Sequence, residues 1–93
     1  MARYLIESPH TMSECLKALD ETLAMGDAKL AQWDWGCMTG DHRGWVVVEA
    51  ENEAAARNMV PSIVRKKAKI VKVDKFTRGD IEGIHIKMAA GKK

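Results

Sequence analysis

Cysteine, histidine and tryptophan gather in one short stretch of this chain, between residues 33 and 45. The stretch contains all three tryptophans of the sequence, together with Cys37 of the two cysteines and His42 of the three histidines. Thiols and imidazoles bind metal ions or act as nucleophiles and bases, and indole rings wall apolar pockets. Gly40 and Asp41 at its centre form a turn signal, so we expect these residues on a β-hairpin.

The length of the hairpin loop decides whether Cys37 and His42 meet. If Gly40 and Asp41 form a two-residue turn, Thr39 faces His42 and Cys37 lies diagonally across on the same side of the sheet. A four-residue loop over residues 38–41 makes Cys37 face His42 directly, and a three-residue loop separates them. Cβ atoms on one face are about 5 Å apart when directly opposite and about 7–8 Å apart on the diagonal. Two of the three loop lengths therefore bring a thiol and an imidazole together.

A metal site is the first hypothesis for this edge of the sheet. His10, Cys37 and His42 would supply three ligands, and Cys15 or Met38 is the candidate fourth. Zinc or a copper-group transition metal suits this mixture of ligands. No CxxC or HxxxH spacing fixes two of the ligands locally. Cys15 also follows a helical stripe that should face the core, where it would be only a small buried hydrophobe.

A pocket for a small molecule is the second hypothesis for the same edge. Trp33 and Trp35 would wall the pocket, with His42 as a general base or hydrogen-bond donor and Cys37 as a nucleophile. The structural alternative is that all three tryptophans fill the core or a dimer interface, because tryptophan is usually well buried. The sequence places no paired acid and base, so we expect binding rather than turnover.

Apolar periodicity predicts the elements that must hold these side chains. Alternation predicts strands over residues 3–8, 30–38, 43–50 and 68–76. Thr11 and Glu14 fit a capping box that begins a first helix, whose apolar stripe comprises Met12, Leu16, Leu19 and Leu23. Asn52 can cap a second helix, which Pro61 must break or restart because proline lacks an amide hydrogen. Thr77 and Asp80 can cap a short last helix, and residues 89–93 read as a frayed tail.

The order of these elements is β-α-β-β-α-β with a C-terminal extension. It predicts an α+β, ferredoxin-like fold, in which a four-stranded antiparallel sheet carries two helices on one face. A single domain would span residues 1–93, with a core over about 2–76 and an extension over 77–93. The first two strands would run in the same direction, so His10, just past the first strand, falls near the hairpin.

The other face of the predicted sheet has no helix to cover it. Tyr4, Trp45 and Val47 are expected on that face, which must bind something or pack against a second copy. Element order and apolar patterning over residues 2–76 resemble the small ferredoxin-like proteins of the dimeric α/β-barrel type. That group includes stress-responsive barrel proteins, small monooxygenases and uncharacterised members. The resemblance implies a homodimer joined through the sheet faces and, as an alternative function, a cofactor-free enzyme acting on a small molecule.

Composition favours a soluble, cytoplasmic protein. Of the 93 residues, 46% are apolar and 30% are charged, which is typical of a globular domain. Apolar runs are too short to cross a bilayer, and the first residues lack the pattern of a signal peptide. Two cysteines do not suggest a disulfide framework, so both are expected as free thiols.

RNA binding is a further alternative, because RNA-recognition domains share this order of elements. Their third strand carries a basic residue, a glycine and aromatic residues, and Arg43, Gly44 and Trp45 match the start of that signature. Tyr4 would supply a second stacking ring, but Val47 replaces a central aromatic. The first 56 residues hold four Lys or Arg against ten Asp or Glu, and the remainder holds eleven against three. This basic C-terminal half would attract phosphate, although a solvated surface explains it equally well.

Overall fold

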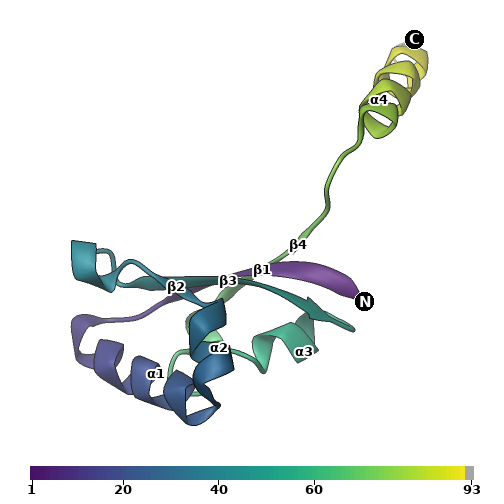
Figure 1. Ribbon diagram of the computed structural model, residues 1–93. Helices are drawn as coiled ribbons and strands as arrows, with labels where there is room; N and C mark the ends of the chain where they lie inside the picture. Colours follow the sequence, from purple (N-terminus) through teal and green to yellow (C-terminus); the bar gives the residue numbers. More distant parts are fainter. Residues whose placement is uncertain (92–93) are drawn as a thin grey trace.

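The computed structural model describes residues 1–91 as a mixed α+β domain with an outlying helix (Figure 1). Three helices, α1, α2 and α3, lie on one side of a four-stranded sheet of order β2-β3-β1-β4, and every neighbouring pair of strands is antiparallel. This arrangement is consistent with a ferredoxin-like fold. In chain order the elements are β1 Ala2–Pro9, α1 Met12–Ala24, α2 Asp27–Gln32, β2 Asp34–Trp35, the 3-10 turn η1 Cys37–Thr39, β3 Arg43–Ala50, α3 Glu53–Arg57, the 3-10 turn η2 Arg65–Lys67, β4 Lys69–Val73 and α4 Arg78–Gly91.

The central strand β1 divides its side chains between the two faces of the sheet. Ile6 is fully buried beneath the helices, where it packs with Val46, Val60 and Val64. Tyr4 also lies on this covered face and is only 8% exposed, so its expected place on the open face is wrong. The cause is the pleat, because residues two apart share a face and Tyr4 therefore follows Ile6 inward.

The open face carries a row of aliphatic side chains. Leu5 pairs with Val47 of β3 and with Val71 of β4, and all three are partly exposed. Arg3 and Glu49 lie opposite each other beyond this row, and on its other side Glu7 faces Trp45. No helix of the described residues covers the row, so the apolar open face expected from the sequence is present, with Trp45 and Val47 on it.

Helix α1 begins as the sequence predicts but faces the core with different residues. The hydroxyl of Thr11 accepts from the Glu14 amide while the Glu14 carboxylate accepts from the Thr11 amide, which completes the capping box. Ala18 and Thr22 are the fully buried residues of the helix. These small side chains let α1 approach the sheet closely. Two polar contacts at the surface also attach the helix to the segment before β4: Glu14 pairs with Lys67, and the Glu21 carboxylate accepts hydrogen bonds from Ser62. The predicted apolar stripe lies on the flank instead, with Met12 78% and Leu16 67% exposed.

The prediction of a strand over residues 30–38 is largely wrong. Residues 27–32 form α2, β2 contains only two residues, and Cys37 begins η1. Alanine and leucine favour the helix over this stretch, and the alternation in residues 30–38 was too short to separate a strand from a helical turn. The strand order still holds because Trp35 pairs with Gly44.

The remaining boundaries follow the expected capping and breaking residues. The Asn52 side chain accepts from the Ala55 amide and begins α3, which ends before Pro61. The last strand is shorter than the predicted residues 68–76 and ends at Val73. Thr77 and Asp80 form the reciprocal cap of α4. At 14 residues, α4 is longer than predicted and includes part of the expected tail, whereas residues 92–93 lie outside the described chain.

Helix α4 stands away from the rest of the molecule, on the side of the sheet opposite α1 and α3 (Figure 1). The radius of gyration is 17.2 Å, against about 12 Å for a compact chain of this length. Among residues 1–91, no helix has the length and apolar character needed to span a membrane.

Gly44 provides a test of how β2 packs on β3. A Cβ atom at this position would come within 2.8 Å of the Trp35 ring. We expect Gly44→Ala to lower the free energy of unfolding by about 1–3 kcal/mol, because the indole must move to make room. Urea unfolding followed by tryptophan fluorescence measures the change. Gly83→Ala is the control, since its Cβ would meet nothing within 4 Å; equal stability of the two variants would contradict this packing.

Candidate metal centre

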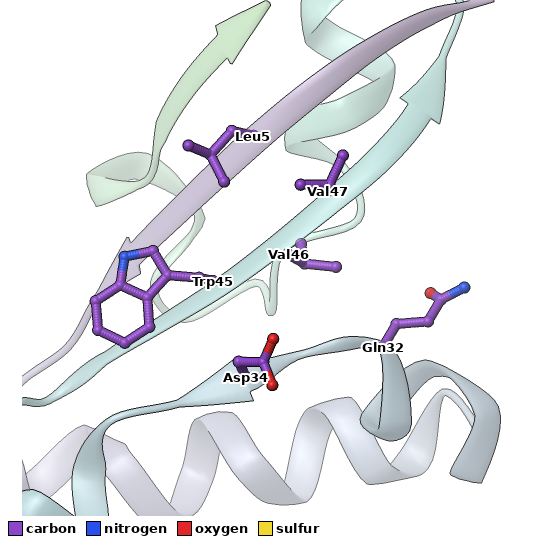
Figure 2. Close-up of a pocket in the computed structure, with 6 residues that line it drawn as sticks. All are labelled: Leu5, Gln32, Asp34, Trp45, Val46 and Val47. Atoms are coloured by element: carbon purple, nitrogen blue, oxygen red, sulfur yellow. The ribbon is translucent and has the colours of Figure 1, made fainter. Parts of the chain in front are cut away.

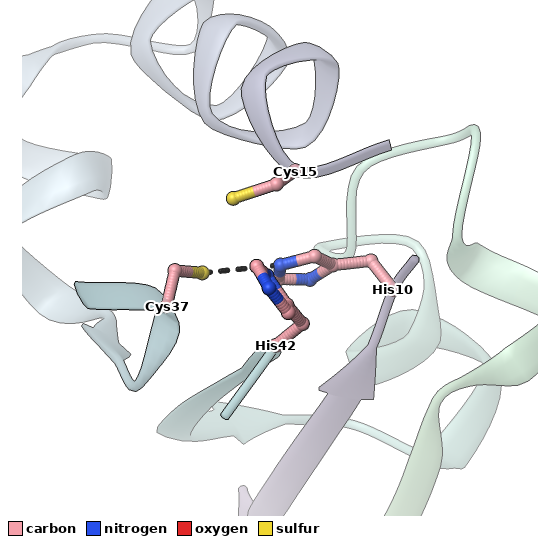
Figure 3. Close-up of side chains that lie close together, drawn as sticks. All are labelled: His10, Cys15, Cys37 and His42. Atoms are coloured by element: carbon pink, nitrogen blue, oxygen red, sulfur yellow. Dashed lines mark hydrogen bonds between the residues drawn. The ribbon is translucent and has the colours of Figure 1, made fainter. Parts of the chain in front are cut away.

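Four side chains with metal-binding atoms converge beyond the carboxyl end of β1 (Figure 3). His10 follows β1, Cys15 lies in the first turns of α1, Cys37 begins η1, and His42 precedes β3. One ligand atom from each of these residues lies within 4.8 Å of every other. Four different segments of the chain therefore contribute one donor each.

The β1–β3 ladder positions the two histidines. Its register pairs Pro9 with Arg43, and the next pair along the strands is His10 with His42. The His10 amide donates to the His42 carbonyl at 3.0 Å, so the ladder continues through this pair. The ring centroids are 5.7 Å apart with the planes at 70°. Sequence reasoning brought His10 near the hairpin but missed this direct pairing, which the alternation of β1 against β3 could have revealed.

The turn between β2 and β3 positions Cys37. The Gly36 amide donates to the Arg43 carbonyl at 3.0 Å and extends the β2–β3 register by one pair. Cys37 would face His42 at the next pair, which is the register of the four-residue loop considered from the sequence. The chain instead forms η1 there and leaves it through Gly40, whose φ of 92° favours glycine. The thiol and the imidazole remain neighbours although Cys37 is not in a strand.

Arg43 fixes the end of this turn from outside the cluster. Its guanidinium donates two hydrogen bonds to the Asp41 carboxylate, at 2.7 and 2.5 Å, and stacks 5.2 Å from the centre of the Trp45 ring. The Arg43 guanidinium holds the pKa of Asp41 below its usual range. This carboxylate is therefore engaged by Arg43 and leaves the cysteines and histidines as the four clustered donors.

The fourth member of the cluster is Cys15, whereas Met38 projects into solvent. Cys15 lies on α1 between the buried side, marked by Ala18, and the exposed flank, and it is half-buried. The Met38 side chain is fully exposed. Of the two candidates for a fourth ligand, the structure thus brings Cys15 to the histidines.

The separations suit a tetrahedral ion. Zinc lies about 2.3 Å from sulfur and about 2.0 Å from nitrogen, so tetrahedral ligand atoms are about 3.3–3.8 Å apart. His10 Nε2 and Cys37 Sγ are separated by 3.1 Å, and no two of the four donor atoms are more than 4.8 Å apart. Adjustments of about 1 Å by side-chain rotation would bring all four donors to one ion.

Burial controls the protonation of the cluster. His10 is 6% exposed, and burial followed by the nearby His42 lowers its pKa, so its imidazole is neutral at pH 7. Burial, followed by the neighbouring Cys15, raises the pKa of Cys37 to about 11. A metal ion must therefore displace a proton from Cys37 but finds the His10 lone pair available.

Two buried nitrogens of the cluster lack hydrogen bonds. His10 Nδ1 and His42 Nδ1 have no partner within the described chain. A buried polar atom without a partner costs roughly 1–3 kcal/mol. His42 Nδ1 is therefore a buried donor atom that the described chain leaves available to a ligand.

The cleft beside the cluster is apolar and differs from the expected pocket. It has a volume of about 390 Å³ and is lined by Met12, Cys15, Leu16, Leu19, Cys37, Met38 and His42. Trp33 and Trp35 are not among its lining residues, although the Trp35 ring centroid lies 6.1 Å from that of His10, so the tryptophan walls stay a prediction. The two indole rings stack 5.4 Å apart, and Trp33 is 6% exposed within the core, as the structural alternative anticipated.

A second hollow lies at the β2 side of the sheet, away from the cluster (Figure 2). Its volume is about 340 Å³, and its walls include Trp45, Asp34 and Gln32. The Trp45 indole donates to the Glu7 carboxylate at 3.3 Å. This hollow contains none of the cysteines or histidines, so it offers no nucleophile or imidazole.

The platform expected for RNA binding is not formed. Tyr4 and Trp45 project from opposite faces of the sheet, because Tyr4 is on the core side and Trp45 is on the open side with Glu7. Two bases could not stack on these rings side by side. Some cations of the basic C-terminal half already have partners within the chain. Arg65 donates to backbone carbonyls, and Lys67 pairs with Glu14.

The pKa shifts predict a stability maximum near neutral pH for the metal-free protein. Unfolded His10 takes up a proton that the folded state resists, so stability falls as the pH drops below about 6.5. Unfolded Cys37 ionises before the folded thiol, so stability also falls above about pH 9. Urea midpoints from pH 5 to 10, with chelator and reductant present, measure both effects. His10→Gln should reduce the loss of stability at acid pH, and Cys37→Ser should reduce the loss at alkaline pH. Variants with the same pH dependence of the urea midpoint as the wild type would contradict these assignments.

Comparison with known proteins yields no matching family model, no matching curated protein and no matching solved structure. The cluster of His10, Cys15, Cys37 and His42 is therefore the feature of this chain that points to a function.

Proposed function

We propose that this protein binds one transition-metal ion through His10, Cys15, Cys37 and His42. The observation that carries the proposal is the mutual distance of the four donor atoms, all within 4.8 Å although they come from four separate segments. The unpartnered, buried Nδ1 of His42 supports the same conclusion, because its lone pair is available to an ion. The structural alternative, a packed cluster without a ligand, leaves that nitrogen unsatisfied.

Zinc is the ion that the ligand set favours. Two thiolates and two imidazoles form one of the common tetrahedral zinc sites, and soft sulfur ligands also accept copper(I). Four protein ligands fill a tetrahedral shell and leave no position for water or substrate. The proposed role is therefore binding that stabilises the fold rather than catalysis at the metal.

A metal ion would supply a connection that α1 otherwise lacks. The helix fully buries only Ala18 and Thr22, packs against the short α2, and makes exposed polar contacts with Lys67 and Ser62. Cys15 would join α1 to the carboxyl end of β1, to η1 and to the start of β3 through one ion. Metal affinity then becomes folding free energy, because the unfolded chain has no preformed site.

The metal content of the purified protein tests the proposal. Untagged protein, prepared without chelator and then offered zinc, should carry about one ion per chain in native mass spectrometry. Cobalt(II) in place of zinc should show thiolate charge-transfer absorption if the cysteines are ligands. Cys15→Ser, Cys37→Ser and His42→Ala should each weaken binding at least tenfold, with the protein otherwise folded by circular dichroism.

His85→Ala is the matched control, because His85 is an exposed histidine on α4. It should bind zinc like the wild type. A wild-type protein that stays metal-free under these conditions, or ligand variants that bind as well as His85→Ala, would contradict the proposal.

A cofactor-free enzyme of the dimeric α/β-barrel type is the second candidate function. The apolar cleft of about 390 Å³ supports it, because Cys37 and His42 lie in its wall. The raised pKa of Cys37 argues against a nucleophilic role, since a reactive thiol needs a lowered pKa. We therefore rank this candidate below metal binding. A cytoplasmic location, like the family resemblance, stays a prediction.

We also propose that the open sheet face joins two copies of the chain. The row of Leu5, Val47 and Val71 supports this pairing, because aliphatic side chains on adjacent strands form one apolar strip. Val47→Glu should shift the protein toward monomer in sedimentation equilibrium, since it would bury a charge between the sheets. Glu49→Gln, two residues along the same face, is the control. A Val47→Glu protein that associates like this control would contradict sheet pairing.

A further inference from the structure

Helix α4 carries an apolar face that contacts nothing else in the described chain. Ile81, Ile84 and Met88 follow one another at spacings of three and four residues and lie on one side of the helix. All three are exposed, as is Phe76 in the segment that leads to the helix. Ile86 lies on nearly the opposite side.

This helix needs a packing surface in order to persist. It is 14 residues long, and isolated helices of that length are marginal in water even when they are rich in alanine. It also contains Gly83 in its interior, which costs about 1 kcal/mol relative to alanine. Contacts of its apolar face must offset this cost.

The flank of α1 offers a surface of matching form. Met12, Leu16, Leu19 and Leu23 run along it with helical spacing, beside the cleft of about 390 Å³ that Met38 also lines. Most of these side chains are largely exposed, and Met12 and Leu16 are the most exposed of them. An apolar helix face laid into such a groove is a common mode of recognition between helices.

The chain's own α4 lies away from this groove. It follows the edge strand β4, whose Val73 lies beside Arg3 at the amino end of β1. The groove lies at the opposite corner, near η1 and the carboxyl end of β1, and α4 is on the other side of the sheet (Figure 1).

The accessible surface of the chain is large enough for an interface with a second copy. The accessible surface is 6732 Å², whereas a compact protein of this mass exposes about 5,400 Å². The excess of about 1,300 Å² is above the roughly 800 Å² that each partner buries in a standard interface.

We propose that α4 of one copy packs along α1 of a second copy, with Ile81, Ile84 and Met88 against Met12, Leu16 and Leu23. The exchange is reciprocal and closes a two-fold dimer. A two-fold axis across the strands brings the amino end of one β1, where α4 starts, toward the carboxyl end of the other. The packed α4 covers the cleft at Cys15 and Cys37. This inference rests on α1 and α4 and does not require a bound metal.

Sedimentation equilibrium of the full chain tests the exchange, in zinc-loaded protein and in protein with chelator. We expect a dimer in both states. Ile84→Glu and Leu16→Glu should each raise the dimer dissociation constant at least tenfold. Ile86→Glu is the matched control and should leave it unchanged, because the same substitution then lies on the opposite side of α4. Leu16→Glu combined with Ile84→Lys should restore association through a new ion pair.

The outcomes separate this inference from the two earlier proposals. A monomeric wild type, or Ile84→Glu and Ile86→Glu with equal dissociation constants, would overturn the exchange. A dimer that is lost in Val47→Glu but kept in both Leu16→Glu and Ile84→Glu would assign the interface to the sheet alone and also overturn it. A wild-type protein that binds no metal but forms a dimer weakened by Ile84→Glu would reject the metal proposal and leave the exchange standing. Circular dichroism confirms that each variant is folded, which is expected because all four positions are exposed.

Discussion

The antiparallel pairing of β1 with β3 is the constraint on which the rest of this molecule depends. Its register runs from Ala2 opposite Ala50 to Pro9 opposite Arg43 and extends to the bond between the His10 amide and the His42 carbonyl. A slip of one residue would turn Ile6 out of the core and move the two imidazoles to different faces. One ladder therefore sets the core, the open face and half of the candidate metal centre.

The core above this ladder is small, and this explains why so much apolar surface remains outside it. Four of the ten buried hydrophobic residues are alanines, at positions 18, 50, 56 and 68. Alanine lets α1 and α3 lie close to the sheet but contributes little buried area per residue. The larger side chains of α1 and α4 stay on the surface. A bound ion or a second copy would stabilise the folded state further, because each binds the native chain and not the unfolded one.

The candidate metal centre and the unpartnered helices are connected through α1. One side of this helix presents Cys15 to the two histidines, and the adjoining flank presents Leu16 to solvent beside the same cleft. An ion would hold α1 from the inside and a packed helix would hold it from the outside. Both the proposed ion and the proposed helix exchange would therefore stabilise the position of α1.

Local chemistry by itself determined several features of this protein. The capping boxes at Thr11 and Thr77 and the cap at Asn52 act within a few residues, so the sequence alone predicted them correctly. The gathering of Cys37 and His42 also followed from one hairpin. Only the tertiary structure decided which side of α1 faces inward, because small residues at Ala18 and Thr22 allow the closest approach, whereas periodicity shows a stripe without its direction. The same holds for Tyr4, for the short β2 and for the choice of Cys15 over Met38, since each depends on contacts between segments far apart in the chain.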